Sequence, residues 1–258
     1  ECFYCYSDID LCIWRHARDV LTMPTEANAL AATMKMWRYM RFSRFLWLLQ
    51  CKQLWLARAD LLGDPWEIAL AGDQLQHVID RHPPSTLPLK AGPIESAMER
   101  VRRIIPKWRQ TTFVNCWCAS EHESHALWRV YCGATEGVAL ETNYDKLIAS
   151  LHGPKLLKVS YENPGSNKRT PTLEDLATKK RPMFEYEHEF RILQTEKGAS
   201  EVPGFPIDWH PEEHLVSIRV HPEADASFMQ TVVAAVADYA PALKDCVVWS
   251  DMRAPPPV

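Results

Sequence analysis

Three glutamates stand at every second position of one short segment, Glu185, Glu187 and Glu189, and Arg191 follows at the same spacing. Side chains of a β-strand alternate between its two faces, so a strand over residues 184–193 would place all four on one face. Carboxylates about 7 Å apart along a strand repel one another, and burial raises their pKa, so such a row costs stability. One carboxylate aimed at a sugar can stabilise an oxocarbenium-like transition state, while its neighbour acts as base for the acceptor. The alternative is a half-exposed strand whose solvent face happens to be acidic.

Two earlier segments carry polar groups that could join such a site. Arg38 lies beside Tyr39 in the middle of a predicted strand, where a guanidinium needs a charged partner or a phosphate. Ser120 follows the predicted strand over 111–119 and presents a small hydroxyl. The alternatives are an arginine on a solvent-facing strand, and a capping box in which Ser120 and Glu123 start the next helix.

The segment 35–59 is both basic and aromatic. It contains six Lys or Arg and no Asp or Glu, namely Lys35, Arg38, Arg41, Arg44, Lys52 and Arg58. Between them stand Trp37, Tyr39, Phe42, Phe45, Trp47 and Trp55. Basic groups with aromatic rings suit phosphate contact and base stacking, which indicates nucleic-acid binding as an alternative function. A core helix and two strands with a cationic outer face would show the same composition.

The sequence gives little support to a metal site, a nucleotide-binding loop or a serine nucleophile. Zinc-type ligands occur at Cys116, Cys118, His122 and His125, but this spacing is not usual for zinc, so we expect no metal. The chain has nine Gly and neither a Gly-x-Gly-x-x-Gly nor a P-loop motif, which argues against both kinds of nucleotide site. It also has no Gly-x-Ser-x-Gly elbow and no recognisable Ser-His-Asp set.

The overall composition is that of an ordinary globular protein, with 258 residues, 47% of them hydrophobic and 24% charged. The formal charge of −4 creates no field that would recruit nucleic acid or an anionic membrane. No run approaches the about 20 apolar residues of a membrane span, so we expect no membrane partner. Eight irregularly spaced Cys, in a chain too large to need disulfides, predict reduced thiols and a cytoplasmic location.

Strands and helices alternate along the chain, and several strands alternate polar with apolar residues. This pattern favours an α+β fold with a mixed, mostly antiparallel central sheet and flanking helices. We predict a helical segment over 1–33, a single α+β domain over 34–250 and a disordered tail over 251–258. A proline-rich surface loop is expected at 81–93. The predicted strands are 36–40, 54–57, 111–119, 137–141, 155–161, 184–193, 215–220 and 246–249. The predicted helices are 43–51 capped by Ser43, one starting at Asp64, 94–105, 124–132, 144–151, one ending at about Lys180, and 226–239, with irregular chain over 198–211.

Four stretches together resemble a mostly bacterial family catalogued as domain of unknown function 2971. The resemblance covers about residues 35–250, and the family name carries no assigned chemistry. The stretches are Leu54-Trp55-Leu56 followed by Gly63-Asp64-Pro65-Trp66-Glu67, Cys116-Trp117-Cys118-Ala119-Ser120 followed by Leu127-Trp128-Arg129-Val130-Tyr131, Gly137-Val138-Ala139-Leu140-Glu141, and Tyr186-Glu187-His188-Glu189-Phe190-Arg191.

A looser likeness concerns the order of Arg38, Ser120, Glu187 and Glu189 along the chain. It resembles the Arg–Ser–Glu arrangement of ADP-ribosyltransferases, which cleave NAD at the nicotinamide–ribose bond. The resemblance implies that Arg38 holds a phosphate or ribose of NAD and that Ser120 lies under the nicotinamide ribose. It implies that Glu189 stabilises the positive charge on the ribose and that Glu187 activates the acceptor.

The likeness also has departures. Where that family has Ser-Thr-Ser, this chain has Cys118-Ala119-Ser120, and Glu185 is an additional carboxylate. Tyr39 and Arg191 adjoin the residues just named, and we expect them to help bind NAD. The fold would then be ADP-ribosyltransferase-like.

We therefore expect an NAD-consuming ADP-ribosyltransferase-like protein or an NAD glycohydrolase, such as a toxin or defence effector. NAD would be the substrate, and a protein or a nucleic acid could be the acceptor. A non-catalytic nucleic-acid-binding module that uses 35–59 stays open as an alternative. So does a structural role, with Asp64, Glu67 and Ser120 as caps and the acidic segment as surface.

Overall fold

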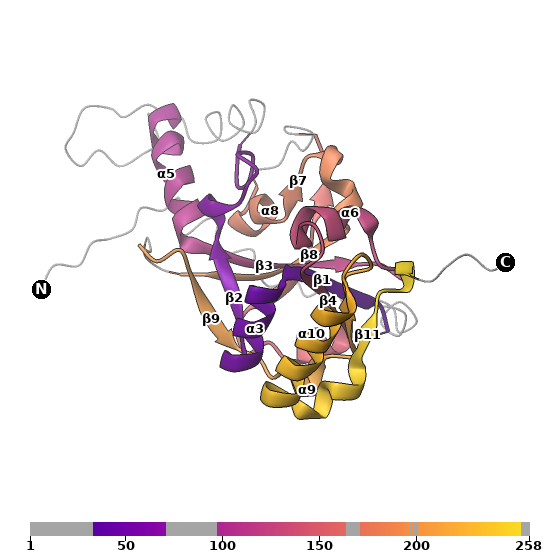
Figure 1. Ribbon diagram of the computed structural model, residues 1–258. Helices are drawn as coiled ribbons and strands as arrows, with labels where there is room; N and C mark the ends of the chain where they lie inside the picture. Colours follow the sequence, from indigo (N-terminus) through magenta and orange to yellow (C-terminus); the bar gives the residue numbers. More distant parts are fainter. Residues whose placement is uncertain (1–32, 71–96, 164–170, 197, 199–200, 254–258) are drawn as a thin grey trace, which may run out of the picture.

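The computed structural model describes residues 33–70, 97–163, 171–196, 198 and 201–253 (Figure 1). The predicted helical segment over 1–33, apart from Thr33, and the proline-rich loop over 81–93 lie outside the described residues. Of the predicted tail over 251–258, Asp251–Arg253 form a 3-10 turn, η6, and 254–258 lie outside the described residues. Among the described residues, no helix combines the length and apolar composition that a membrane crossing needs.

One large sheet organises the described part of the chain. Its main path runs β11-β10-β4-β1-β3-β2-β9, while β8 pairs with β3 on one side and β5 on the other. Every pairing in it is antiparallel except that of β10 with β11, so the predicted α+β fold with a mostly antiparallel sheet is confirmed. The strands are β1 Lys35–Arg41, β2 Gln53–Arg58, β3 Thr112–Ala119, β4 Gly137–Asn143, β5 Lys155–Lys158, β8 Glu189–Thr195, β9 Gly204–Asp208, β10 Ser217–Val220 and β11 Val247–Trp249. A second, two-stranded sheet pairs β6 Ser160–Tyr161 with β7 Lys179–Lys180 in parallel.

Helices cover both faces of the large sheet (Figure 1). On one side lie α3 Phe42–Cys51 and α10 Ala226–Tyr239, and on the other lie α5 Ala97–Thr111, α6 His125–Leu127 and α8 Leu173–Ala177. The alternation within β1 explains both contacts, because its side chains point to opposite faces in turn. Met36 and Met40 join the core under α3 and α10, whereas Trp37 and Tyr39 pack with Trp128 on the opposite face. The remaining short helices are η1 Ala59–Leu61, η3 Trp128–Cys132, α7 Tyr144–Ala149, η4 Pro182–Glu187, α9 Pro211–His214 and η5 Pro241–Cys246.

The sheet forks at β3. One edge of β3 pairs with β8 from Thr112 to Cys118, whereas the other edge pairs with β2 at its start and with β1 at its end. Asn115 sits at the fork, where its side-chain amide donates to the Trp55 carbonyl of β2 at 2.8 Å and accepts from Arg38 of β1 at 2.8 Å. Arg38 also donates to the Cys116 carbonyl at 2.6 Å. These two side chains therefore replace the backbone hydrogen bonds that β3 loses where β1 and β2 diverge.

Three helix starts differ from the prediction. The helix α3 begins at Phe42 with Arg41 as N-cap, not at Ser43, because the Phe42 amide donates to the Glu136 carbonyl and needs no side-chain cap. Asp64 caps a single turn through the Trp66 amide. Ile68 has φ 49° and ends this turn, so no helix follows Asp64 within the described residues. The cap of α6 is Ser124, which accepts from the Leu127 amide, so the predicted Ser120–Glu123 capping box is wrong.

The region over 198–211, predicted to be irregular, contains β9. This strand pairs with β2 along its whole length, including Pro206 opposite Trp55. A proline cannot donate to a ladder, but β9 is an edge strand and needs donors on one side only. A Cβ on Gly204 would lie 2.3 Å from the Leu56 carbonyl oxygen, so the glycine permits the close approach of the two backbones.

Candidate functional site

The row of glutamates is not one strand face. Pro182–Glu187 form the 3-10 helix η4, and β8 begins only at Glu189. Glu187 and Glu189 are buried, while Glu185 is exposed, so the predicted strand over 184–193 and its three-carboxylate face are wrong in the first half. The second half holds, because Glu189 and Arg191 lie on the same face of β8 and are hydrogen-bonded.

The local sequence explains this break. Pro182 occupies the first turn of η4, where its missing N–H is not needed. A 3-10 helix has three residues per turn, so Glu185 and Glu187 point in different directions. His188 then takes the left-handed conformation with φ 41°, which ends η4 and turns the chain into β8.

Five charged side chains meet beneath η4, and we call them the acid–base cluster: Glu67, Lys180, Glu187, Glu189 and Arg191. The Lys180 ammonium bridges two of the carboxylates, at 2.5 Å from Glu187 and 2.7 Å from Glu189. Glu187 is 7% exposed and Glu189 is 3% exposed. With three carboxylates and two cations, the cluster keeps one negative charge in excess when all five are ionised.

Arg191 is the anchor of the cluster and is 1% exposed. Its guanidinium donates to both oxygens of Glu67 at 2.7 Å, to Glu189 at 2.8 Å and to the Ala177 carbonyl at 2.6 Å. Glu67 comes from the turn after Asp64, 124 positions away along the chain. A two-pronged guanidinium–carboxylate pair is the strongest geometry for such an ion pair. It fixes this turn against β8.

The two carboxylates that share Lys180 have opposite pKa shifts. Burial would raise the pKa of Glu189, but Arg191 and Lys180 outweigh it and lower the value to about 2. Burial raises the pKa of Glu187, and Lys180 only partly opposes the rise. Such a divergence is typical of catalytic carboxylate pairs in which one group stays ionised and the other exchanges a proton. Structural ion-pair networks also shift pKa values.

Two tyrosines, Tyr131 and Tyr161, hydrogen-bond to members of the acid–base cluster. The Tyr131 hydroxyl donates to Glu187 at 3.1 Å, and burial raises the pKa of this hydroxyl, although 43% of the residue as a whole is exposed. The Tyr161 hydroxyl accepts from the Glu189 amide at 2.7 Å. Burial raises the pKa of Tyr161 to about 12, so this hydroxyl stays protonated at neutral pH. On the sheet side, the Cys116 thiol hydrogen-bonds Glu189, and burial raises the pKa of that thiol.

The residues predicted to bind NAD lie on neighbouring strands, but their polar groups already have partners. Trp37, Cys118 and Glu189 are aligned across β1, β3 and β8 and share one face of the sheet. Arg38, the next residue of β1, projects from the other face, where its guanidinium lies over the Trp117 ring. The Arg38 guanidinium is engaged at the fork, and no carboxylate of the described residues lies within ion-pair distance of it. Burial lowers its pKa.

Tyr39 and Ser120 are also engaged. The Tyr39 hydroxyl accepts from the Ser124 amide at 2.7 Å, and its ring packs edge-on against Trp128 at 5.2 Å. The Ser120 hydroxyl donates to the His122 carbonyl at 2.7 Å and accepts from the His122 amide. No contact joins Ser120 to the acid–base cluster, although the amide next to it, that of Ala119, donates to the His188 carbonyl.

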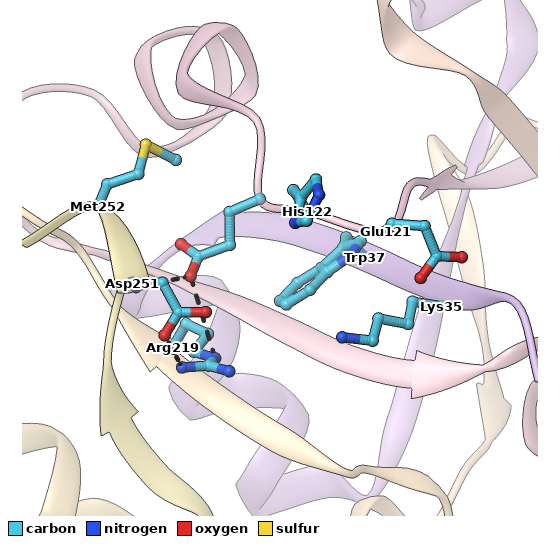
Figure 2. Close-up of a pocket in the computed structure, with 8 residues that line it drawn as sticks. Lys35, Trp37, Glu121, His122, Arg219, Asp251 and Met252 are labelled. Atoms are coloured by element: carbon cyan, nitrogen blue, oxygen red, sulfur yellow. Dashed lines mark hydrogen bonds and ion pairs between the residues drawn. The ribbon is translucent and has the colours of Figure 1, made fainter.

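A cavity of about 380 Å³ opens at the end of β3 (Figure 2). It is lined from β1, the loop after β3, β10 and η6, and it includes Trp37, whose indole N–H donates to the Ser120 carbonyl at 2.8 Å. Glu187 and Glu189 are not among its lining residues. In the described part of the chain, no three His, Cys, Asp or Glu side chains are grouped as metal ligands would be.

The basic, aromatic segment 35–59 uses most of its rings for packing. Trp37, Tyr39 and Phe45 are buried in the core, and Trp47 packs edge-on against Trp55 at 6.1 Å. Lys52 is ion-paired with Glu212. Arg41 and Arg44 are exposed. Stacking on a nucleobase needs an accessible ring face, so these contacts argue against base stacking by the rings that they cover.

Three members of the site have no signal in the sequence that singles them out. Lys180 lies in an ordinary basic run before Pro182, and Glu67 has the spacing of a helix-capping residue. Tyr131 belongs to a stretch that carries the likeness to the family of unknown function, but nothing there indicates a carboxylate partner. Their roles depend on contacts between segments that are distant in the sequence.

A comparison with known protein families matches part of the chain. Residues 127–192, about a quarter of the chain, match the family described as "Protein of unknown function (DUF2971)". This stretch contains Tyr131, Lys180, Glu187, Glu189 and Arg191. No curated protein matches the chain. These findings give no support to the likeness to ADP-ribosyltransferases, which remains a hypothesis. Over residues 127–192 the chain is thus similar to a family whose function is not known, and the similarity includes four of the five charged residues of the acid–base cluster.

Proposed function

We propose that the protein consumes NAD, breaking the bond between nicotinamide and ribose and passing the ADP-ribosyl group to an acceptor or to water. The observation that carries the proposal is the divergence of two adjacent carboxylates, with the pKa of Glu189 lowered to about 2 and that of Glu187 raised. Cleavage of a glycosidic bond needs such a pair, one group to face the developing positive charge and one to move a proton.

In this reaction the nicotinamide nitrogen leaves with the electrons of its bond to the ribose carbon. Positive charge develops on the ribose, and the excess negative charge of the acid–base cluster, in which Glu189 is ionised at neutral pH, stabilises it. The acceptor oxygen or nitrogen then bonds to the ribose carbon, and its proton passes to Glu187. Tyr131, hydrogen-bonded to Glu187 and partly exposed, would contact the substrate or the acceptor in this proposal.

The experiment measures nicotinamide release from NAD by the purified protein, with and without a cell extract as a source of acceptors. Glu189→Gln and Glu187→Gln should each lower the rate by at least about 100-fold, since each removes a charge or a proton carrier. Glu185→Gln is the matched control, because it alters the same helix η4 at an exposed carboxylate and should leave the rate unchanged. Failure of the wild-type protein to consume NAD, together with no thermal stabilisation by NAD, would refute the proposal.

A further inference from the structure

The cavity at the end of β3 is bordered by charges that already pair with one another (Figure 2). Arg219 donates to Asp251 at 2.7 Å. The same guanidinium lies 4.0 Å from Glu123 and 3.9 Å from Glu141, and the Lys35 ammonium lies 3.6 Å from Glu141. Glu123 and Glu141 have 3% and 7% of their side chains exposed, and these two buried carboxylates balance the two cations. An ionic ligand would have to displace one partner and leave a buried charge uncompensated, which is costly.

Two further carboxylates at the cavity are exposed to solvent. Asp251 has 75% of its side chain exposed, and Glu121 is exposed and has no ion pair with a described residue. Water and salt screen exposed charges, so these two carboxylates create only a weak preference for a cation. The surroundings of the cavity therefore suit a ligand without net charge.

Three of these ion pairs are open. Their separations of 3.6, 3.9 and 4.0 Å are too long for hydrogen bonds, and the Arg219 Nε–H is buried without a hydrogen-bond partner. A buried donor without an acceptor is costly. A hydroxyl both donates and accepts, so one hydroxyl between a cation and a carboxylate can bridge the two. Because the open pairs share Arg219 and Glu141, they favour a ligand that carries several neighbouring hydroxyls.

The size and the apolar part of the cavity fit the same class of ligand. Its volume of about 380 Å³ lies near the lower end of the range for small-molecule sites. One or two bridging waters would not fill this space, since a molecule of liquid water occupies about 30 Å³. Trp37 and Met252 also line the cavity, and Met252 is 37% exposed. These two side chains offer apolar contact to the C–H groups of a sugar ring.

We propose that this cavity binds a neutral polyhydroxyl molecule of the size of a monosaccharide. Hydroxyls of the ligand would bridge Arg219 to Glu123 and to Glu141. The Lys35 ammonium would donate to a further hydroxyl, and Met252 would contact C–H groups of the ring. The proposal does not depend on NAD being the substrate of the acid–base cluster, and it assigns a second small-molecule site to the protein.

Isothermal titration calorimetry with D-glucose, D-ribose and myo-inositol tests the proposal directly, and at least one of them should bind. Cyclohexanol has a six-membered ring with one hydroxyl, so it should bind at least about tenfold more weakly, because it loses hydrogen bonds to charged groups. D-Glucuronate and D-glucosamine add one charge of either sign and should bind at least about tenfold more weakly than the best neutral ligand. Absence of binding by all three neutral compounds overturns the proposal, and so does binding of cyclohexanol or a charged analogue as tight as that of the best neutral ligand.

Two variants of cavity residues locate the binding. Lys35→Gln removes a charged hydrogen bond and should raise the dissociation constant about tenfold. Met252→Ala removes apolar contact and should raise the dissociation constant about fivefold. Lys244→Gln and Met183→Ala are matched controls that should leave the dissociation constant unchanged, because both residues are exposed and lie outside the cavity. Unchanged affinity in both cavity variants, with thermal unfolding like that of the wild type, would place the ligand elsewhere and overturn the proposal.

Discussion

Replacing Arg191 by Met tests the acid–base cluster most directly, because Met keeps an unbranched side chain and removes the charge and every donor. The guanidinium is 1% exposed and donates to Glu67, Glu189 and the Ala177 carbonyl. Without it, two buried carboxylates depend on Lys180 alone. Removing one partner of a buried ion pair costs about 3–5 kcal/mol. The fall of the Glu189 pKa from 4.5 to about 2 corresponds to about 3 kcal/mol, of which Lys180 supplies a part. We therefore expect Arg191→Met to lower the free energy of unfolding by about 3 kcal/mol at pH 7.

The loss should depend on pH in a definite direction. In the wild type, the lowered pKa of Glu189 contributes stability that is complete above its ordinary value of 4.5 and is lost as pH falls towards 2. In the variant, the pKa of Glu189 rises, because burial remains and Arg191 is gone. Protonation then relieves the uncompensated charge at a higher pH. The difference in stability between wild type and variant should therefore shrink between pH 7 and pH 4.

Urea unfolding followed by tryptophan fluorescence measures both effects, since the chain has ten Trp. Arg44→Met is the control, because Arg44 is exposed on α3, and it should change stability by no more than about 0.5 kcal/mol. Combining Glu67→Gln with Arg191→Met should cost less than the sum of the two single changes, since each already breaks the same contact. A loss below about 1 kcal/mol for Arg191→Met, or a loss that does not vary with pH, would show that the cluster does not stabilise the fold in this way.

Three further predictions concern other parts of the molecule. Asp225→Ala removes the side-chain cap of α10 and should lower the unfolding free energy by about 1 kcal/mol, measured by urea unfolding, whereas Asp225→Asn should restore most of it. Gly137→Ala would place a Cβ 2.3 Å from the Cβ of Cys132, so it should lower the thermal midpoint, and a midpoint equal to that of the wild type would contradict this contact. In native protein treated with a thiol reagent at pH 8, peptide mapping should find Cys51 modified and Cys118 protected. Cys51 is exposed, whereas burial raises the pKa of Cys118 to about 12. Equal labelling of the two thiols would be inconsistent with the burial of Cys118.

The sequence predicts the sheet well where its pattern reflects one dominant cause. β1 and β3 occur where short runs rich in aromatic and other apolar residues indicate strands, because both faces of these central strands are covered. β9 escapes prediction, since Gly204 and Pro206 are breakers in isolation. They become acceptable only at a sheet edge where a glycine lets β2 approach, and the position of that edge depends on the whole topology.

The candidate site shows the same limit. Glu189 and Arg191 share a face as the spacing predicts, because both lie in β8. Glu187 also points inward, but for a different reason, as it ends a 3-10 helix that Pro182 begins. A period of two and a period of three coincide over so few residues that the pattern does not distinguish them. The partner Lys180 comes from β7, and no rule of spacing along the chain brings it to Glu187 and Glu189.

The role of Glu187 distinguishes a purely structural cluster from a catalytic one, because the first predicts a contribution to stability and the second a contribution to the reaction. Glu67, Glu189 and Arg191 satisfy one another, and their burial is explained by the need to fix the turn after Asp64 against β8. Glu187 adds a third carboxylate to two cations, its pKa is raised, and its remaining contact is an exposed tyrosine. Glu187 adds little to the free energy of unfolding, because without its charge the cluster would hold two carboxylates and two cations. Glu187→Gln should therefore leave the unfolding free energy unchanged or slightly higher, while it abolishes turnover of NAD. Glu189→Gln should lower both the unfolding free energy and the rate of NAD turnover. A Glu187→Gln variant that is destabilised as strongly as Glu189→Gln would assign Glu187 to the scaffold, and the proposed proton transfer would lose its residue.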